Sequence, residues 1–154
     1  MSRLTILQWP DARLRTECRM ITTFDTDLAT FAQDMLDTMY AAKGRGLAAP
    51  QVGVMTRMFV MDVGWKSGAP TPMVCINPTI AAIGSNKSTG EEQCLSIPDR
   101  PIQVKRFRSI RMRWLDLNGD IQKAELSDAA AIIAQHEADH LDGRLILDVA
   151  DHLI

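Results

Sequence analysis

The stretch QHEADHLDG contains two histidines four residues apart, with a glutamate directly after the first. On a helix, residues four apart lie on one face, so His136 and His140 can reach one metal ion. Glu137 can then approach a water on that ion without binding the ion itself, which is the logic of the H-E-x-x-H motif. The stretch therefore predicts a metal site with a general base beside it.

The alternative is a helix whose histidines face solvent or a polar pocket, because a bare H-E-x-x-H match also occurs by chance. The apolar run AAAIIA before the motif argues against this alternative, since an unsatisfied buried imidazole would be costly. Two of the three histidines in the chain also lie in this one motif. Both observations favour metal binding.

A catalytic site of this kind uses three protein ligands and leaves a position open for water. Downstream of Gly143 only Asp148, Asp151 and His152 could be the third ligand, and no glutamate-bearing second helix follows. We therefore expect that ligand upstream. There, STGEEQCLSIPDRP places Cys94 on a short extended piece between turns, although a free cysteine taken alone is more often a buried apolar residue.

The stretch GRGLAAPQVG is rich in glycine and alanine, which lets its backbone come close to another group. Taken alone it indicates only a tight loop, in which Gln51 is a polar loop residue. Cys18 and Cys75 are assigned to the buried core. Three widely spaced cysteines argue against a disulfide framework and indicate a reducing cytoplasm.

The elements that must position these residues begin with a helix. Helical spacing in TDLATFAQDMLDTMYAAKG predicts it, with Asp25 or Thr26 as the cap and Gly44 as the stop. The stretches VMTRMFVMDV and MVCINPTIAAIG are rich in apolar and β-branched residues, so they predict strands. The dipeptide Asn118-Gly119 between two alternating runs predicts a hairpin.

The C-terminal motif is predicted to lie on a second helix, capped by Ser127 and closed by Gly143. The order is helix, several strands, helix, without β-α-β alternation. We therefore expect an α+β fold in which antiparallel β-sheets surround the motif-bearing C-terminal helix, with an N-terminal helix beside them. A single catalytic domain should span residues 1–154.

Composition is that of an ordinary globular protein, with 46% hydrophobic and 23% charged residues in a chain of 154. The formal net charge of −2 gives no reason to expect a nucleic-acid surface. We see no signal peptide and no run near the ~20 apolar residues of a membrane span. The basic cluster VKRFRSIRMRW alternates with apolar residues, which predicts a solvated strand face.

Together, the three stretches resemble the peptide deformylase family. They appear in the family's order and at comparable spacing, as GRGLAAPQ (44–51), EQCLS (92–96) and HEADHLDG (136–143). The resemblance implies that Cys94, as a thiolate, joins His136 and His140 around one divalent metal ion. In the family this ion is usually Fe²⁺, with Zn²⁺ and others able to bind, and the sequence does not choose between them.

The implied reaction is hydrolysis of the formamide on the N-terminal formyl-methionine of a nascent chain at the ribosome. The metal lowers the pKa of its bound water, and Glu137 takes a proton during attack and passes it to the departing amine. The Gln51 amide and the Leu95 N–H are implied donors to the developing oxyanion. We expect a cytoplasmic monomer with a formyl-methionyl peptide as its partner and no nucleic-acid or membrane contact.

Further roles follow from the same resemblance. Glu92 and Arg106 match an ion pair that braces the cysteine loop, although two solvated surface charges would also fit the sequence. Asp139 is expected to steady the site from behind the ligands. Gly46 is expected to form hydrogen bonds with the substrate backbone. Ile132 and Ile133 are expected to line the pocket for a methionine-like side chain, although both would equally serve as core residues.

Two positions depart from the family pattern. The family's E-G-C-L-S reads EQCLS here, so Gln93 adds a polar side chain where the substrate backbone passes and removes the freedom of glycine. We expect a narrowed or reshaped cleft with lower activity or altered specificity. Arg45 stands where an aliphatic residue is common, and it adds a charge at the cleft mouth that would favour an anionic group on the substrate.

Three functions remain open on these residues. The first is deformylation of formyl-methionyl peptides, and the second is hydrolysis of another N-acyl or formamide substrate, because cleft residues differ. The third is a binding or regulatory protein without turnover, which the presence of Glu137 and Gln51 argues against. The chain ends 11 residues after Gly143, so the C-terminal helix that docks some relatives on the ribosome is not expected.

Overall fold

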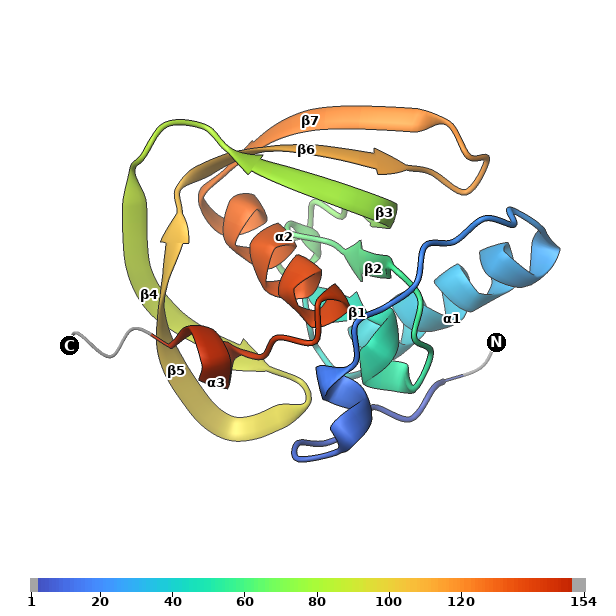
Figure 1. Ribbon diagram of the computed structural model, residues 1–154, viewed down its shortest axis with the longest axis horizontal. Coiled ribbons are helices and arrows are strands. Elements are labelled where there is room, and N and C mark those ends of the chain that lie inside the picture. The colour runs from blue at the N-terminus through green and yellow to red at the C-terminus, as the bar shows by residue number, and fades with distance from the viewer. Residues whose placement is uncertain (1–2, 151–154) are drawn as a thin grey trace.

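The computed structural model describes residues 3–150 (Figure 1). The strands are Gly46–Ala48 (β1), Met58–Met61 (β2), Met73–Ala82 (β3), Lys87–Cys94 (β4), Ile97–Phe107 (β5), Ser109–Leu115 (β6) and Ile121–Ser127 (β7). The helices are Thr26–Ala41 (α1), Asp128–Leu141 (α2) and Ile146–Val149 (α3), with 3-10 turns at Ala12–Arg15 (η1), Ala49–Val52 (η2) and Trp65–Ser67 (η3).

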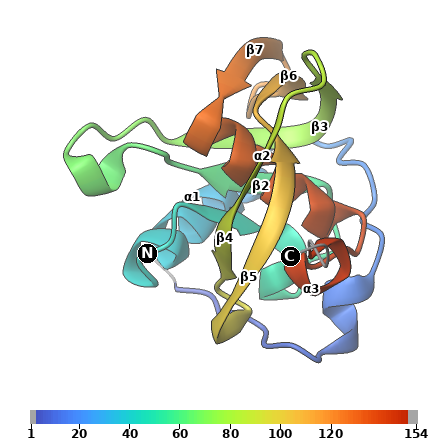
Figure 2. The same cartoon turned by 90° about the vertical axis from the view of Figure 1, so that its left-hand side faces the viewer.

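All strand pairs are antiparallel, and they form two sheets. The five-stranded sheet has the order β1-β2-β3-β6-β7, and β4 pairs with β5 as a separate two-stranded sheet. The sheets surround α2, while α1 lies outside the five-stranded sheet (Figure 1). Figure 2 shows β4 and β5 crossing in front of α2. The α+β fold expected from the sequence is confirmed.

Strand β2 shows how the larger sheet separates two hydrophobic cores. Alternate side chains of a strand point to opposite faces, and all four apolar residues of β2 are buried because both faces of the sheet are covered. Phe59 and Met61 pack in the cluster that includes residues of α2, whereas Met58 and Val60 pack in the cluster that includes residues of α1. Cys18 and Cys75 are buried free thiols, as predicted. The central helix is thereby fixed against a fully packed sheet.

Helix α1 begins as predicted and ends earlier than predicted. The Asp25 side chain caps it by accepting a backbone N–H. The helix ends at Ala41, and Lys43 then takes a left-handed φ of 60°. The Gly44 N–H donates to the Met39 carbonyl at 2.9 Å. The left-handed residue that ends the helix is therefore Lys43, not the glycine one position later.

Helix α2 carries the motif and ends at Leu141, with Asp142 as its C-cap and the predicted stop, Gly143, directly after it. Gly143 has a φ of 72°, and a Cβ there would lie 2.5 Å from the Arg15 carbonyl oxygen. The predicted side-chain cap is wrong, because Ser127 occupies the N-cap position without a capping hydrogen bond. Its hydroxyl lies 3.1 Å from that of Ser109, its partner in the β6–β7 ladder. Strand pairing therefore takes the hydroxyl away from the helix.

The predicted hairpin and basic strands are present, with one exception. Strands β6 and β7 pair on either side of Gly119, which has a φ of 81°. Lys105, Arg111 and Arg113 are exposed, as a solvated strand face requires. Arg106 is only 7% exposed and belongs to the site described below. None of the helices within residues 3–150 combines the length and apolar character needed to cross a bilayer.

Candidate metal centre and active site

Three side chains from two elements converge below the β4–β5 sheet. Cys94 ends β4, and His136 and His140 lie one turn apart on α2. All three are buried, and their ligand atoms lie within 4.8 Å of one another. The Cys94 Sγ is 3.4 Å from the His140 Nε2. Sulfur and nitrogen ligands at ~2.3 and ~2.0 Å from one tetrahedral ion are about 3.6 Å apart, so this donor set fits one divalent metal.

The downstream alternatives do not join this group within the described residues. Both carboxylate oxygens of Asp148 accept hydrogen bonds from Arg15, at 2.9 and 2.7 Å. Asp151 and His152 lie outside the described residues. The expectation of an upstream third ligand thus agrees with the geometry, which brings a cysteine to the two histidines.

Cys94 is presented by an irregular end of the β4–β5 sheet. Regular pairing runs to Glu92 and Ile102 and resumes at Cys94 and Ile97, so β5 carries extra residues opposite Gln93. The backbone of Gln93 does not have a positive φ. The chain therefore adopts a conformation there that glutamine takes without strain. The Gln93 side chain is exposed and lines the cleft beside the cysteine.

A buried network of charged side chains orients His136 on the side of its ring away from the metal position. Glu92 accepts two hydrogen bonds from Arg106, at 2.9 and 3.0 Å, and its Oε1 lies 2.9 Å from the His136 Nδ1. Arg106 also donates to Asp139 at 2.5 Å. The ring nitrogen Nε2 of His136 is thereby left for the metal side. Sequence reasoning expected the Glu92–Arg106 pair but missed the contact to His136, which joins distant positions without a local signal.

The buried charges shift the pKa values of this cluster. Burial raises the pKa of Glu92, but hydrogen bonds from His136 and Arg106 outweigh it and bring the pKa below its usual range. Burial lowers the pKa of His136, but Glu137, Cys94 and Glu92 raise it to about 10. Burial and the His136 charge hold the pKa of His140 well below its usual value.

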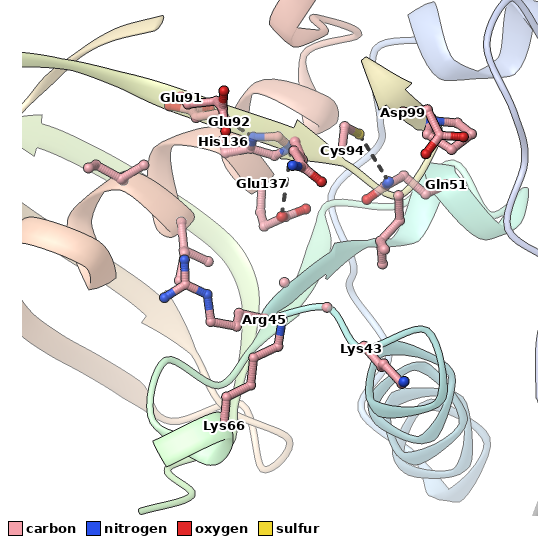
Figure 3. A pocket seen from close by; sticks show the side chains of 17 residues that line it. Lys43, Arg45, Gln51, Lys66, Glu91, Glu92, Cys94, Asp99, His136 and Glu137 are labelled. Carbon is pink, nitrogen blue, oxygen red and sulfur yellow. Dashed lines mark hydrogen bonds and ion pairs between the residues drawn. The ribbon is translucent and has the colours of Figure 1, made fainter. Parts of the chain in front are cut away.

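Glu137 is the buried carboxylate beside the three-residue group. Burial raises the pKa of Glu137 to about 7. Its Oε2 lies 4.0 Å from the His136 Nε2, and its buried Oε1 has no hydrogen-bond partner among residues 3–150. A divalent cation nearby would lower this pKa, because positive charge favours the carboxylate. A proton acceptor with a free oxygen thus faces the metal position (Figure 3).

Gln51 reaches the same point from η2. Its Oε1 accepts the Ala48 N–H at 2.9 Å, while its Nε2 donates to the Ser96 hydroxyl at 3.0 Å and lies 3.6 Å from the Cys94 Sγ. Leu95, between the cysteine and the serine, lines the same cleft. Sequence reasoning missed Ser96, whose buried hydroxyl fixes the direction of the Gln51 amide.

The N-terminal segment joins the two loops that carry these groups. The Leu7 N–H donates to the Gln51 carbonyl at 2.7 Å, and the Trp9 N–H donates to the Ser96 carbonyl at 2.8 Å. The Gln8 side chain donates to the Leu95 carbonyl at 3.2 Å. Backbone contacts of this kind leave no side-chain pattern, so sequence reasoning could not find them.

The cleft in front of the group has a volume of about 590 Å³. All five residues that were expected to contact the substrate line this cleft, namely Arg45, Gly46, Gln93, Ile132 and Ile133. Asp139 does not line it and is joined to the site by its ion pair with Arg106. The sequence-predicted residues therefore lie in one place, with Asp139 behind the others.

Gly46 is the point where β1 meets Glu137. A Cβ on Gly46 would lie 2.5 Å from the Glu137 Oε2. The Asp62 N–H donates to the Arg45 carbonyl at 2.9 Å, so Gly46 and Met61 form a non-hydrogen-bonded pair. Because β1 is an edge strand, the N–H and C=O of Gly46 point to its free side. An extended peptide can pair there, next to the carboxylate.

Comparisons with known proteins identify the family of the chain. The model of the polypeptide deformylase family matches residues 3–153. The chain belongs to the polypeptide deformylase family. A peptide deformylase from Alkalilimnicola ehrlichii is 45% identical over 153 residues, which cover 99% of this chain and 85% of the relative. One from Brucella suis is 41% identical over 148 residues, covering 96% and 85%.

Solved structures of peptide deformylases have the same fold. The enzyme from Thermotoga maritima superposes with a TM-score of 0.92 at 38% identity, covering 98% of this chain and 99% of that one. A probable peptide deformylase from a Synechococcus phage, S-SSM7, gives 0.89 at 33% identity, covering 95% and 99%. The chain is thus a deformylase-family hydrolase with a Cys-His-His group suited to a metal ion.

Proposed function

We propose that this deformylase hydrolyses the formamide on the N-terminal formyl-methionine of new polypeptides, giving formate and a free amine. One observation carries the proposal. Glu137, a buried carboxylate with an unpartnered oxygen, faces the convergent side chains of Cys94, His136 and His140. A purely structural metal site needs no such base.

Cys94, His136 and His140 would hold one divalent ion, with Fe²⁺ as the proposed physiological metal and Zn²⁺ as an alternative. A thiolate with two imidazoles suits either ion. When bound, the ion supplies Lewis acidity and an activated water at neutral pH. The buried Glu92 carboxylate orients the His136 ring for this role, because it occupies Nδ1.

Glu137 accepts the proton of the attacking water. Its Oε1 has no other partner, so the carboxylate is free to receive that proton and then deliver it to the departing amine. Close packing against Gly46 fixes the position of the carboxylate. The same side chain therefore serves both halves of the reaction without a change of rotamer.

Gln51 and Leu95 stabilise the charge that develops on the formyl oxygen. The Gln51 Nε2 carries two hydrogens, and Ser96 takes one of them at 3.0 Å. The second donates to the Cys94 Sγ at 3.6 Å, a long contact that the substrate oxygen would replace, and the Leu95 N–H is the other proposed donor. Loss of one such donor typically lowers kcat by about 10²–10³.

The substrate would bind as an extended strand against Gly46, whose N–H and C=O face the free edge of β1. Ile132 and Ile133 would line the pocket for the methionine side chain, since both lie in the cleft one turn before His136. We further propose that the enzyme acts as a cytoplasmic monomer on nascent chains at the ribosome.

One assay tests the function. Protein loaded anaerobically with Fe²⁺ is mixed with a formyl-Met peptide or the matching acetyl-Met peptide, and release of the free amine is measured. We expect turnover of the formyl peptide, little turnover of the acetyl peptide, and loss of activity in Glu137→Gln with metal content retained. The control is Glu91→Gln, an equivalent change at an exposed carboxylate of the cleft. Metal binding without turnover of either peptide would overturn the proposal.

A second function, hydrolysis of a different N-acyl group, is favoured by one observation. The exposed side chain of Gln93 lines the cleft next to Cys94, where it can alter the shape available to the substrate. Faster turnover of the acetyl-Met peptide than of the formyl-Met peptide would support this function and overturn the first.

A further inference from the structure

The cleft carries unequal charge on its two sides. Lys43, Arg45 and Lys66 lie on the side formed by the α1–β1 turn and η3, and Glu91 lies opposite them on β4 (Figure 3). All three cationic side chains are exposed, and none has a carboxylate partner among residues 3–150. Their charges are therefore available to a molecule in the cleft.

Hydrogen bonds to backbone carbonyls place two of these cations, Arg45 and Lys66, beside the free edge of β1. The Arg45 carbonyl accepts the Asp62 N–H, which locks Arg45 at the start of β1. The Trp65 indole donates to the Gly44 carbonyl at 2.9 Å and packs edge-on against a tyrosine of α1. Lys66, the next residue, is thus fixed next to the chain at Gly44.

The order of residues along β1 fixes the direction of a bound peptide. Gln51 follows Gly46 in the chain and lies 3.6 Å from Cys94, at the metal end of the cleft. Arg45 precedes Gly46 and lies away from that end (Figure 3). A peptide that places its formyl group at the metal and pairs with Gly46 therefore runs antiparallel to β1. Its residues after the formyl-methionine then pass Arg45 and Lys66.

We propose that Arg45 and Lys66 make this deformylase select substrates with an acidic side chain in the second or third residue. The inference rests on the proposed function and adds the class of substrate. Glu91 opposes the two cations but is outnumbered along this path. Asp99 also lines the cleft, on the side where Figure 3 shows Cys94 and Gln51 and away from Arg45 and Lys66. Exposed ion pairs change binding by about two- to fivefold each, and salt weakens them.

The test compares formyl-Met peptides that differ only in the second or third residue, which is Asp, Asn or Lys. At low ionic strength we expect kcat/KM to fall in that order at one of these positions, with about a tenfold ratio of Asp to Lys. The ratio of kcat/KM for Asp and Lys peptides should approach one at about 1 M salt, because the Debye length there is only ~3 Å. In the double variant Arg45→Glu, Lys66→Glu, the order should reverse.

The matched control is Arg113→Glu, Lys123→Glu, which changes the net charge equally. These two exposed cations are cross-strand partners on the β6–β7 sheet, outside the cleft, so this variant should keep the wild-type ratio. A preference of the wild-type enzyme for Lys peptides, or an equal ratio at both salt concentrations, would overturn the inference while leaving deformylation intact. No turnover of any formyl peptide would overturn the proposed function, and the inference with it.

Discussion

Glu92 Oε1 lies 2.9 Å from His136 Nδ1, so a carboxylate on β4 fixes the ring of a proposed metal ligand on α2. The same carboxylate accepts two hydrogen bonds from Arg106, which in turn bonds Asp139. One buried carboxylate therefore joins the strand, the helix and the site. Its removal should affect the metal and the fold in separable ways.

Replacing Glu92 by Gln should weaken metal binding about 10- to 100-fold, because an amide is a poorer acceptor for the His136 Nδ1. The measurement is competition with a chromophoric chelator under anaerobic conditions. Glu91→Gln is the control, since Glu91 is the exposed neighbour on the same strand. Equal affinities of the two variants would contradict the assigned role of Glu92.

Replacing Arg106 by Met should lower the free energy of unfolding by about 3–5 kcal/mol, because Glu92 and Asp139 lose the buried guanidinium that they share. Urea denaturation in chelator, which strips the metal from every sample, isolates this effect from metal loss. Lys105→Met is the control at the next, exposed position, and we expect it to change stability by less than about 0.5 kcal/mol. A similar change in both variants would contradict the prediction.

Replacing Gly46 by Ala should lower kcat/KM about 100-fold, because its Cβ would lie 2.5 Å from the Glu137 Oε2 and must displace the base. Far-UV circular dichroism and metal content should stay close to wild type. The control is Gly90→Ala, where a Cβ meets no atom within 4 Å. An active Gly46→Ala enzyme would mean that the carboxylate position is not critical.

Replacing Gln93 by Gly should raise kcat/KM on a formyl-Met peptide several-fold, because it clears an exposed side chain from the cleft. The backbone at this position has no positive φ, so the gain should come from space and not from relief of strain. Gln103→Gly, the same change on β5 outside the cleft, controls for weakening of the sheet. No rise in kcat/KM would reject the idea that Gln93 obstructs the substrate.

Local patterns in the sequence predicted the elements and part of the site. Helical spacing alone placed His136 and His140 on one face, and the Asn-Gly dipeptide marked the β6–β7 hairpin. Local rules failed where a partner from another element decides the outcome. Ser127 is an ordinary capping residue, but its hydroxyl meets Ser109 of the adjacent strand. Arg106 belongs to an alternating basic run, but Glu92 and Asp139 hold it in the interior.

The third member of the metal group could not be derived from spacing. Cys94 and the histidines are far apart in the chain and meet only because the two-stranded sheet crosses α2 (Figure 2). Resemblance to a family supplied that pairing, and the geometry agrees with it. It did not supply Ser96 or the Glu92–His136 contact, which depend on side-chain directions within this fold.

The β4–β5 sheet shares no ladder with the five-stranded sheet, and two-stranded sheets are marginally stable by themselves. Gln135 ties α2 to the backbone of Phe107 on β5, and further polar ties between this sheet and α2, from Glu92 and Arg106, run through the site. A metal ion at Cys94 would act as a rivet between hairpin and helix. Chelation should increase amide hydrogen exchange first in Lys87–Cys94, because loss of the ion would let this hairpin open locally before the rest of the molecule unfolds.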